Sequence, residues 1–219
     1  MKKKPEQMVT ELVFVLDRSG SMQGLEQDTI GSFNSLIEEQ KKEPGMALVS
    51  TVLFDDECEV VHDRVPLDQV GALTSDQYCV RGCTALLDAI GFALQHVNHA
   101  QKIQPQKRPD KTLVVITTDG MENASRTFTY EKVRQLIDKR RRKRDWEFLF
   151  LGANIDAIGT AASMGIQADH ATSYLSDSQG TQLSYAAVSA AALQFRSCSE
   201  AGISPRWKAS LEQDVQARG

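Results

Sequence analysis

Two apolar runs that each end in small polar residues constrain the fold of this chain most. The first run, residues 12–16 (Leu-Val-Phe-Val-Leu), leads directly into Asp17-Arg18-Ser19-Gly20-Ser21. The second, residues 113–116 (Leu-Val-Val-Ile), ends in Thr117-Thr118-Asp119-Gly120. Short apolar runs rich in β-branched residues and bounded by turn residues are typical of buried strands. The pattern predicts an α/β fold with a parallel sheet, whose carboxyl edge is where ligands bind.

A third loop, residues 81–88 (Arg-Gly-Cys-Thr-Ala-Leu-Leu-Asp), runs into a predicted helix. A parallel sheet would bring all three loops to one end. There the small oxygen donors Asp17, Ser19, Ser21, Thr84 and Asp119 would meet. Hydroxyls and carboxylates suit a hard divalent cation, and Mg²⁺ and Mn²⁺ both prefer octahedral oxygen shells. The sequence therefore predicts a Mg²⁺ or Mn²⁺ site and does not choose between the two ions.

These three motifs in this order resemble the metal-ion-dependent adhesion site of the von Willebrand factor type A family. The resemblance covers residues 9–195, and all five positions match the pattern Asp-x-Ser-x-Ser, Thr and Asp. It implies a doubly wound, Rossmann-like domain with a mostly parallel sheet, one antiparallel edge strand and helices on both faces. It also implies that Ser19 and Ser21 ligate the metal, that Thr84 binds directly or through water, and that Asp17 and Asp119 act mostly through water or by orienting the hydroxyls.

The resemblance implies a protein-binding role for the site. A first shell of neutral hydroxyls leaves most of the cation's charge uncompensated, so an open coordination position would attract a carboxylate from a partner protein. Glu122 and Asn123 either line the binding face or cap the next segment, and the sequence leaves both interpretations open. Asn154 and Asp156 are rim candidates, whereas Asp88 is expected either to support the ligand residues from behind or to pack its helix. The full set of binding-face candidates is Gly20, Gly82, Gly120, Glu122, Asn123, Asn154 and Asp156.

Length and composition predict one globular domain. The 219 residues divide into a leader (1–8), the domain (9–198) and a polar tail (199–219) that we expect to be loose. The net charge of −4 argues against a general nucleic-acid binder. No apolar stretch has transmembrane length, and the basic start lacks the features of a signal peptide, so we expect a cytoplasmic protein without membrane contact. The sequence does not indicate an oligomeric state.

The remaining patterns predict a series of alternating strands and helices. Expected strands cover residues 11–16, 47–54, 58–65, 112–117, 146–151 and 169–174, and the short polar run 58–65 fits an antiparallel edge. Expected helices cover residues 25–41, 84–99, 129–143, 155–164 and 179–197. The family resemblance leaves open whether the helix over 179–197 shifts when the metal site is engaged.

Cysteines, histidines and a basic run have plain structural interpretations. The cysteines lack the paired spacing of a zinc site, and Cys83, directly before Thr84, is expected to be a buried inert thiol. His96 and His99 are expected at a solvated helix end. Residues 139–144 (Lys-Arg-Arg-Arg-Lys-Arg) could bind phosphates or an acidic partner, but a solvated helix C-terminus fits better.

The sequence gives less support to two other functional classes, an enzyme and a passive adaptor. A Mg²⁺-dependent hydrolase using Asp17 as nucleophile would need a carboxylate two residues on, where this chain has Ser19. Serine-hydrolase and nucleotide-binding motifs are absent from the sequence, so we do not expect an enzyme. The third class is an adaptor subunit with a passive metal in a larger assembly, for example with a separately encoded ATPase, a metal chelatase or a tellurite-resistance system.

Overall fold

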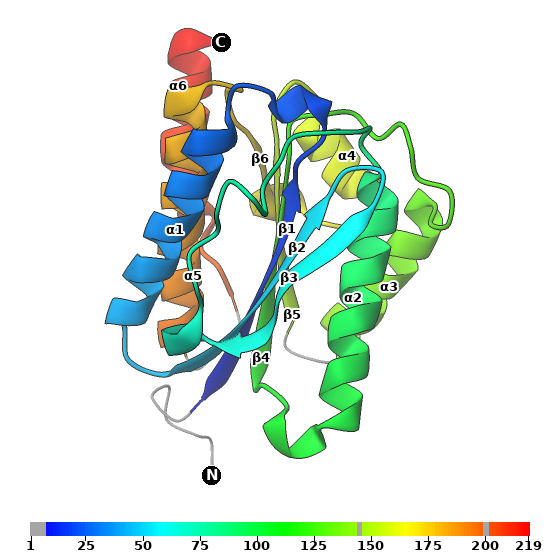
Figure 1. Cartoon of the computed structure of the whole chain (residues 1–219), viewed down its shortest axis with the longest axis vertical. Coiled ribbons are helices and arrows are strands. Elements are labelled where there is room, and N and C mark those ends of the chain that lie inside the picture. Colours follow the sequence, from blue (N-terminus) through cyan, green and yellow to red (C-terminus); the bar gives the residue numbers. More distant parts are fainter. Residues whose placement is uncertain (1–7, 144–145, 199–201) are drawn as a thin grey trace.

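The six strands form one sheet that runs in the order β3-β2-β1-β4-β5-β6. The computed structural model describes residues 8–143, 146–198 and 202–219 (Figure 1). Neighbouring strands are parallel except for β3, which pairs antiparallel with β2 at the edge. The strand bounds are β1 Val9–Asp17, β2 Met46–Phe54, β3 Cys58–Pro66, β4 Lys111–Thr118, β5 Trp146–Gly152 and β6 Ala171–Ser173. This is the predicted doubly wound sheet with one antiparallel edge strand.

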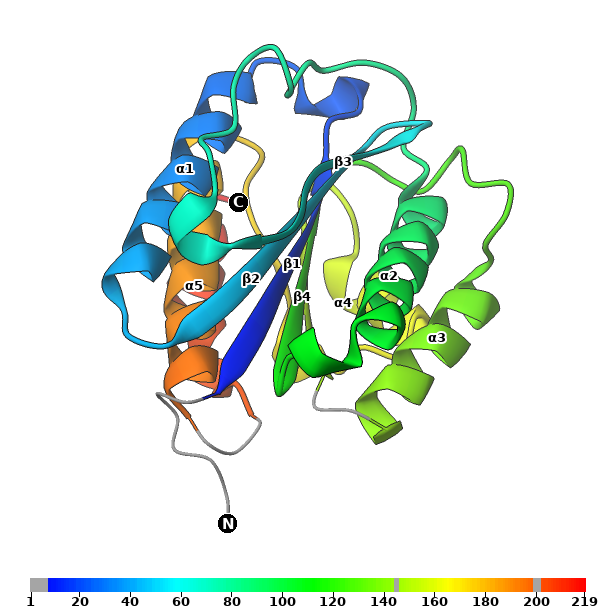
Figure 2. The same cartoon turned by 60° about the horizontal axis from the view of Figure 1, so that its bottom comes forward.

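Helices cover both faces of the sheet. Helices α1 and α5 lie on one face and α2, α3 and α4 on the other, as the two views in Figures 1 and 2 show. The helix bounds are α1 Glu26–Lys42, α2 Leu86–Ile103, α3 Tyr130–Lys143, α4 Ala157–Ser163, α5 Ser178–Ser197 and α6 Ala209–Arg218. Because both faces are covered, the central strands must be apolar on both sides, which explains their continuous apolar runs.

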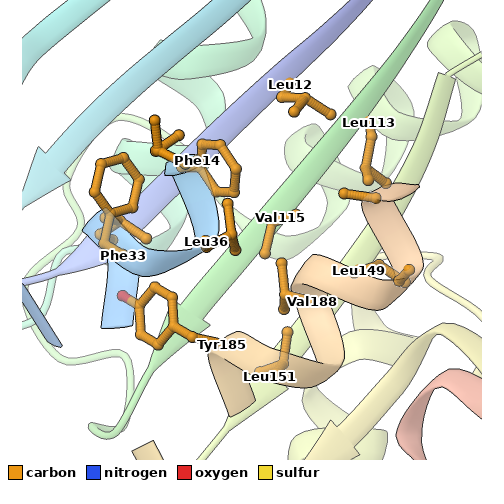
Figure 3. Packing of buried hydrophobic residues seen from close by; sticks show 14 of the residues in the cluster. Leu12, Phe14, Phe33, Leu36, Leu113, Val115, Leu149, Leu151, Tyr185 and Val188 are labelled. Atoms are coloured by element: carbon orange, nitrogen blue, oxygen red, sulfur yellow. The ribbon is translucent and has the colours of Figure 1, made fainter. Parts of the chain in front are cut away.

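Alternate residues of β1 enter two separate hydrophobic clusters. Leu12 and Phe14 pack toward α1 and α5, whereas Val13 and Val15 pack toward α2 and α3. Figure 3 shows the first cluster, in which Phe33 of α1 meets Phe14 edge-on with ring centroids 5.4 Å apart. Burying each such side chain contributes about 1.5–3 kcal/mol relative to leaving it exposed. These two clusters hold β1 rigidly, and the loop that follows Asp17 therefore starts from a fixed point.

The predicted elements are found within four residues at each end. The largest difference is at α2, which continues to Ile103 instead of ending near residue 99. The predicted edge hairpin is present, with Phe54 opposite Cys58 across its turn. The loops after β1 and β4 lie at the upper end of the sheet in Figure 1, opposite the end at which these two strands begin.

The expectation of a loose tail is wrong for residues 202–219. Helix α6 forms there, and Ile203, Trp207 and Leu211 are buried in the cluster shared with α1 and α5. The Trp207 Nε1 donates to the Asp169 carbonyl at 2.9 Å, which ties this segment to the start of β6. A burial of three large apolar side chains outweighs the polar composition that suggested a solvated tail.

Two sequence-based expectations fall partly outside the described residues. The proposed leader covers residues 1–8, of which only Met8 is described, and Arg144 of the basic run also lies outside. Within the described part of the chain, no helix combines the length and apolar character needed to cross a membrane.

Candidate metal centre

Three hydroxyl groups from two loops meet at the carboxyl edge of the sheet. Ser19 Oγ lies 2.9 Å from Ser21 Oγ, and Thr84 Oγ1 donates to Ser19 Oγ at 2.9 Å. We call Ser19, Ser21 and Thr84 the hydroxyl cluster. Ser19 and Thr84 are almost completely buried, although their loops lie at the end of the sheet. Ser21 is exposed, so the hydroxyl cluster has a buried side and a side that faces solvent.

Asp17 lies directly beneath this cluster at the end of β1. Its Oδ1 accepts a hydrogen bond from the Ser19 backbone N–H at 2.7 Å, and its Oδ2 accepts from Thr118 Oγ1 at 2.5 Å. The pKa of Asp17 is raised to about 6, mainly because the carboxyl is buried. The hydrogen bonds from Thr118 and Ser19 lower this pKa, and the charge of Asp119 raises it, but both effects are smaller than that of burial. The carboxylate is thus costly to ionise here without a compensating positive charge.

Asp119, at the end of β4, leaves one buried oxygen unpaired. Its Oδ2 accepts a hydrogen bond from Ser176 Oγ at 3.0 Å. Its Oδ1 is buried and has no hydrogen-bond partner among the residues that the structure describes. Nearly all buried polar atoms in folded proteins find a partner, so such an atom calls for an explanation. A cation at this place would supply one.

The donor set fits a hard divalent cation. Two carboxylates and three hydroxyls supply oxygen ligands only, which is the set that Mg²⁺ and Mn²⁺ prefer. Across residues 8–143, 146–198 and 202–219, no group of three His, Cys, Asp or Glu side chains is placed to hold a metal. A metal here would therefore depend on the hydroxyl cluster, with Asp17 and Asp119 supplying the negative charge.

A glycine keeps this space open. A Cβ added to Gly120 would lie 2.8 Å from Thr84 Oγ1 and 2.9 Å from Ser21 Oγ. Real Cβ atoms essentially never approach other atoms so closely, so a larger residue would push the hydroxyls apart. The backbone after Asp119 can approach the hydroxyl cluster only because residue 120 has no side chain.

Two further glycines shape the loops around the cluster. Gly20 donates its backbone N–H to the Gly82 carbonyl at 3.2 Å, which joins the first and second loops. Gly82 has φ +67°, and a Cβ there would lie 1.9 Å from Asp56 Oδ1. Gly82 is therefore required by both backbone conformation and space, and its role is to position Thr84 two residues later.

Glu122 and Asn123 hold the loop after β4 in place. Asn123 Oδ1 accepts from the Thr84 N–H at 3.0 Å, and the Asn123 N–H donates to the Thr84 carbonyl at 3.1 Å. Glu122 Oε2 accepts from the Leu87 N–H at 2.9 Å, and its Oε1 accepts from the Ser125 N–H at 2.8 Å. Glu122 thus caps the segment that follows it, as one of the two interpretations held, whereas the exposed Asn123 binds the loop of Thr84 instead.

The remaining carboxylate candidates also bind backbone groups. Asp88 accepts hydrogen bonds from the N–H groups of Arg126, Thr127 and Phe128, which matches packing, one of the two roles expected for it. Asp156 caps α4 by accepting from the Gly159 N–H at 2.9 Å. Asn154, exposed and at φ +56°, turns the chain after β5 at the same end of the sheet. Asn154 and Asp156 thus lie on a separate loop from the hydroxyl cluster.

An ion-pair network that the sequence did not indicate supports the first two loops. Buried Arg18 donates through Nε to Asp55 Oδ2 at 2.9 Å and through Nη1 to Glu59 at 2.6 Å. Arg81 Nε also donates to Asp55 Oδ2, at 2.7 Å, and the Arg81 N–H donates to the Arg18 carbonyl. Burial alone would raise the pKa of Asp55, but the hydrogen bond from Arg81, the Glu57 N–H and the charge of Arg18 lower it overall.

The sequence also did not indicate three hydroxyl groups that bind Asp17 and Asp119. Tyr78 donates its phenol O–H to the Asp17 carbonyl at 2.5 Å, while Thr118 and Ser176 bind the carboxylates of Asp17 and Asp119. Thr118 lies next to Asp119 in the sequence, which was the one available signal. Tyr78 and Ser176 are 61 and 57 residues away from their partners, so no local pattern could reveal them.

The expectation that Cys83 is buried is wrong. Cys83 and Cys79 are exposed, and Cys58 and Cys198 are partly buried, all four as free thiols. Cys83 points outward because Thr84, the next residue, turns inward to the hydroxyl cluster. Burial is the main cause that raises the pKa of the Cys58 thiol to about 11, with the charges of Asp88 and Asp55 adding to it.

The basic run is only partly solvated. Arg140 is buried, with its guanidinium 5.7 Å from the centre of the Trp146 ring, and Arg141 donates to the Gly165 carbonyl at 3.2 Å. Lys139 and Arg142 are exposed. The interpretation as a solvated helix end therefore holds for these two residues and is wrong for Arg140, whose side chain covers the start of β5.

Three solved structures share the fold of this chain at low sequence identity. Proximal thread matrix protein 1 from the mussel byssus has a TM-score of 0.58 at 13% identity, over 86% of this chain and 47% of that one. The PilB minor pilin from Streptococcus sanguinis also has a TM-score of 0.58, at 12% identity, over 86% of this chain and 62% of that one. The manganese-loaded TRAP protein from Plasmodium vivax has a TM-score of 0.52 at 15% identity, over 83% of this chain and 73% of that one.

These likenesses show the fold alone. The chain covers less than two thirds of the mussel and pilin chains. Neither the protein-family models nor the curated proteins give a match. Together with the strand order, the likenesses confirm the Rossmann-like, von Willebrand factor type A fold predicted from the three motifs.

Proposed function

We propose that this protein is a divalent-metal-dependent protein-interaction module that binds an acidic group of a partner. The observation that carries the proposal is the unpaired, buried Oδ1 of Asp119, next in sequence to Gly120, which closely approaches two of the three clustered hydroxyls. The manganese-loaded TRAP structure, which has a similar fold, adds support from outside this chain.

Some residues of the site would bind the metal directly, and others would supply charge near it. Ser19, Ser21 and Thr84 would hold Mg²⁺ or Mn²⁺ through their hydroxyls, with Asp17 and Asp119 providing negative charge nearby. A bound ion would supply an open coordination position that attracts a carboxylate oxygen. Without the ion, the two buried aspartates would repel an acidic partner, so partner binding should depend on the metal.

A catalytic role has less support. Asp17 is the residue that a nucleophilic mechanism would use, but the Ser19 N–H and the Thr118 hydroxyl occupy its two oxygens. Ser19, in the position of a general acid, belongs to the hydroxyl cluster and carries no titratable group. We therefore propose binding, rather than bond cleavage, as the function of this centre.

The proposal is tested by capturing partners from a lysate of the source organism on the immobilised protein. Proteins retained in Mg²⁺ should be released by a chelator and should not be retained by Asp119→Ala. Asp68→Ala is the matched control, because Asp68 is an exposed carboxylate that follows β3 at the opposite end of the sheet. Retention that survives chelation would contradict the proposal and would favour an adaptor with a passive metal.

A further inference from the structure

The residue directly after the candidate metal centre is a strongly exposed methionine. Met121 follows Asp119 and Gly120 and is 71% exposed, the largest value for a large apolar residue within the described parts of the chain. Isolated apolar residues on a surface are ordinary and need no functional explanation. The position of Met121, next to a cluster of metal-type ligands, gives this one a meaning.

The contacts of its neighbours place Met121 at the rim of the site. Gly120 lies so close to Thr84 Oγ1 and Ser21 Oγ that even a Cβ would not fit. On the other side, Asn123 binds both backbone groups of Thr84, at 3.0 and 3.1 Å. The segment 120–123 is therefore fastened along Thr84, and Met121 is carried on it at the edge of the hydroxyl cluster.

The rim next to Met121 offers an apolar contact, while charged side chains lie on the adjoining loop, where Asp56 is close to Gly82 and Arg81 is half exposed. Glu122, its neighbour in sequence, directs its carboxylate to backbone N–H groups of residues 87, 124 and 125. Cys83, exposed directly before Thr84, presents a thiol on the adjoining loop. Met121 and Cys83 are both exposed and each adjoins a residue of the site in the sequence, and such soft, adaptable side chains favour apolar contacts.

We propose that the partner segment carries an apolar side chain beside its metal-binding carboxylate, and that this side chain packs on Met121. The inference rests on the proposed function, because the carboxylate must be held at the metal centre for the neighbouring residue to reach the rim. An apolar residue adjacent to the carboxylate should improve affinity about tenfold, as expected for burial of part of a methionine side chain. The thioether can adapt to aliphatic neighbours of different shape.

The experiment uses the full chain with its methionine methyl groups labelled with ¹³C and with Mg²⁺ present. Mg²⁺ is chosen because it is diamagnetic and leaves the methyl signals sharp. Two blocked tripeptides, acetyl-Leu-Asp-Leu-amide and acetyl-Gly-Asp-Gly-amide, are titrated in and followed by NMR. The Met121 signal is identified as the one lost in Met121→Leu. The apolar peptide should bind about tenfold more tightly and should shift the Met121 methyl signal.

Three variants separate packing from general effects. Met121→Ser should remove the advantage of the apolar peptide, whereas Met121→Leu should keep most of it. Met46→Ser is the matched control, because Met46 is 61% exposed but lies at the amino end of β2, opposite Val9. Both methionines are strongly exposed, so replacing either should leave the fold unchanged.

The outcomes distinguish this inference from the proposed function. Equal, Mg²⁺-dependent binding of both peptides with an unmoved Met121 signal would overturn the inference and leave the proposed function standing. Binding of the apolar peptide that persists after chelation would overturn both, and so would a failure of both peptides to bind in Mg²⁺. Tighter, Mg²⁺-dependent binding of the apolar peptide that Met121→Ser abolishes would support it.

Discussion

Replacing Asp55 by Asn is expected to destabilise the protein and to weaken metal binding, although Asp55 is not a proposed ligand. Asp55 is 1% exposed and is shared by Arg18, which is 2% exposed, and by Arg81. Its loss would leave the Arg18 guanidinium buried with Glu59 as its remaining acidic partner. The loops that carry Ser19 and Thr84 would then lose their common anchor.

The size of the effect follows from burial. Breaking a buried ion pair by removing one partner costs about 3–5 kcal/mol, because it leaves an uncompensated charge. Glu59 still pairs with Arg18, so we expect about 3 kcal/mol, and the half-exposed Arg81 adds less than about 1 kcal/mol. For a chain of this length, that corresponds to a fall in Tm of roughly 6–12 °C.

The assay is urea and thermal unfolding of the chelator-treated protein, followed by calorimetric metal titration. Glu57→Gln is the matched control: Glu57 lies in the same turn, but its side chain is 76% exposed and 3.5 Å from Arg81. The control should change the free energy of unfolding by less than about 0.5 kcal/mol. A loss below about 1 kcal/mol in Asp55→Asn would refute the reasoning that the network holds these loops.

Three further predictions concern the site and its surroundings. Gly120→Ala should weaken metal binding at least about tenfold in calorimetry, because the new methyl group displaces the Thr84 and Ser21 hydroxyls. Gly71→Ala is the control and should leave the affinity unchanged, because there is open space around Gly71. Equal metal affinities of the two variants would contradict the close approach of Gly120 to the hydroxyls. In metal-free protein, the pKa of Asp17 lies at about 6 in the folded state, above its ordinary value of 3.8. The folded state therefore favours the protonated form, and the contribution of Asp17 to the free energy of unfolding should fall by ~2 kcal/mol as the pH rises from about 4 to 7. Asp17→Asn should lack this fall. If urea unfolding gave the same change in the free energy of unfolding with pH for both proteins, the prediction would be contradicted. Alkylation at about pH 8 should modify exposed Cys79 and Cys83 before Cys58, because burial raises the pKa of the Cys58 thiol to about 11; peptide mass spectrometry showing Cys58 modified equally fast would disprove this.

The fold could be predicted because its signals are local. The runs 12–16 and 113–116 are apolar at every position, which indicates strands covered on both faces. The tail escaped this reasoning because its apolar residues are few. Ile203, Trp207, Leu211 and Val215 recur every four residues, a helical spacing that the surrounding polar residues masked. The burial of the first three depends on a surface of α5 and β6 that no local pattern describes.

The candidate site could be predicted only as far as its strand ends. Ser19, Ser21 and Thr84 lie within hydrogen-bond distance of one another, as expected where loops meet at the carboxyl edge of a parallel sheet, and their role as metal ligands stays a prediction. The Arg18–Asp55 pair joins residues 37 positions apart, and its existence depends on how the β2–β3 turn folds over the first loop. Such long-range polar contacts carry no periodic signal, so the sequence could not reveal them.

The most direct test of the metal centre is calorimetric titration of chelator-stripped protein with Mg²⁺ and with Mn²⁺, with acetate present to complete the coordination shell. The Ser19→Ala/Ser21→Ala double variant is the control, with circular dichroism to verify its fold. We predict saturable binding of both ions to the natural protein and its loss in the folded double variant. Undiminished binding in the double variant, or no binding to the natural protein even with acetate, would contradict a metal centre built on these hydroxyls.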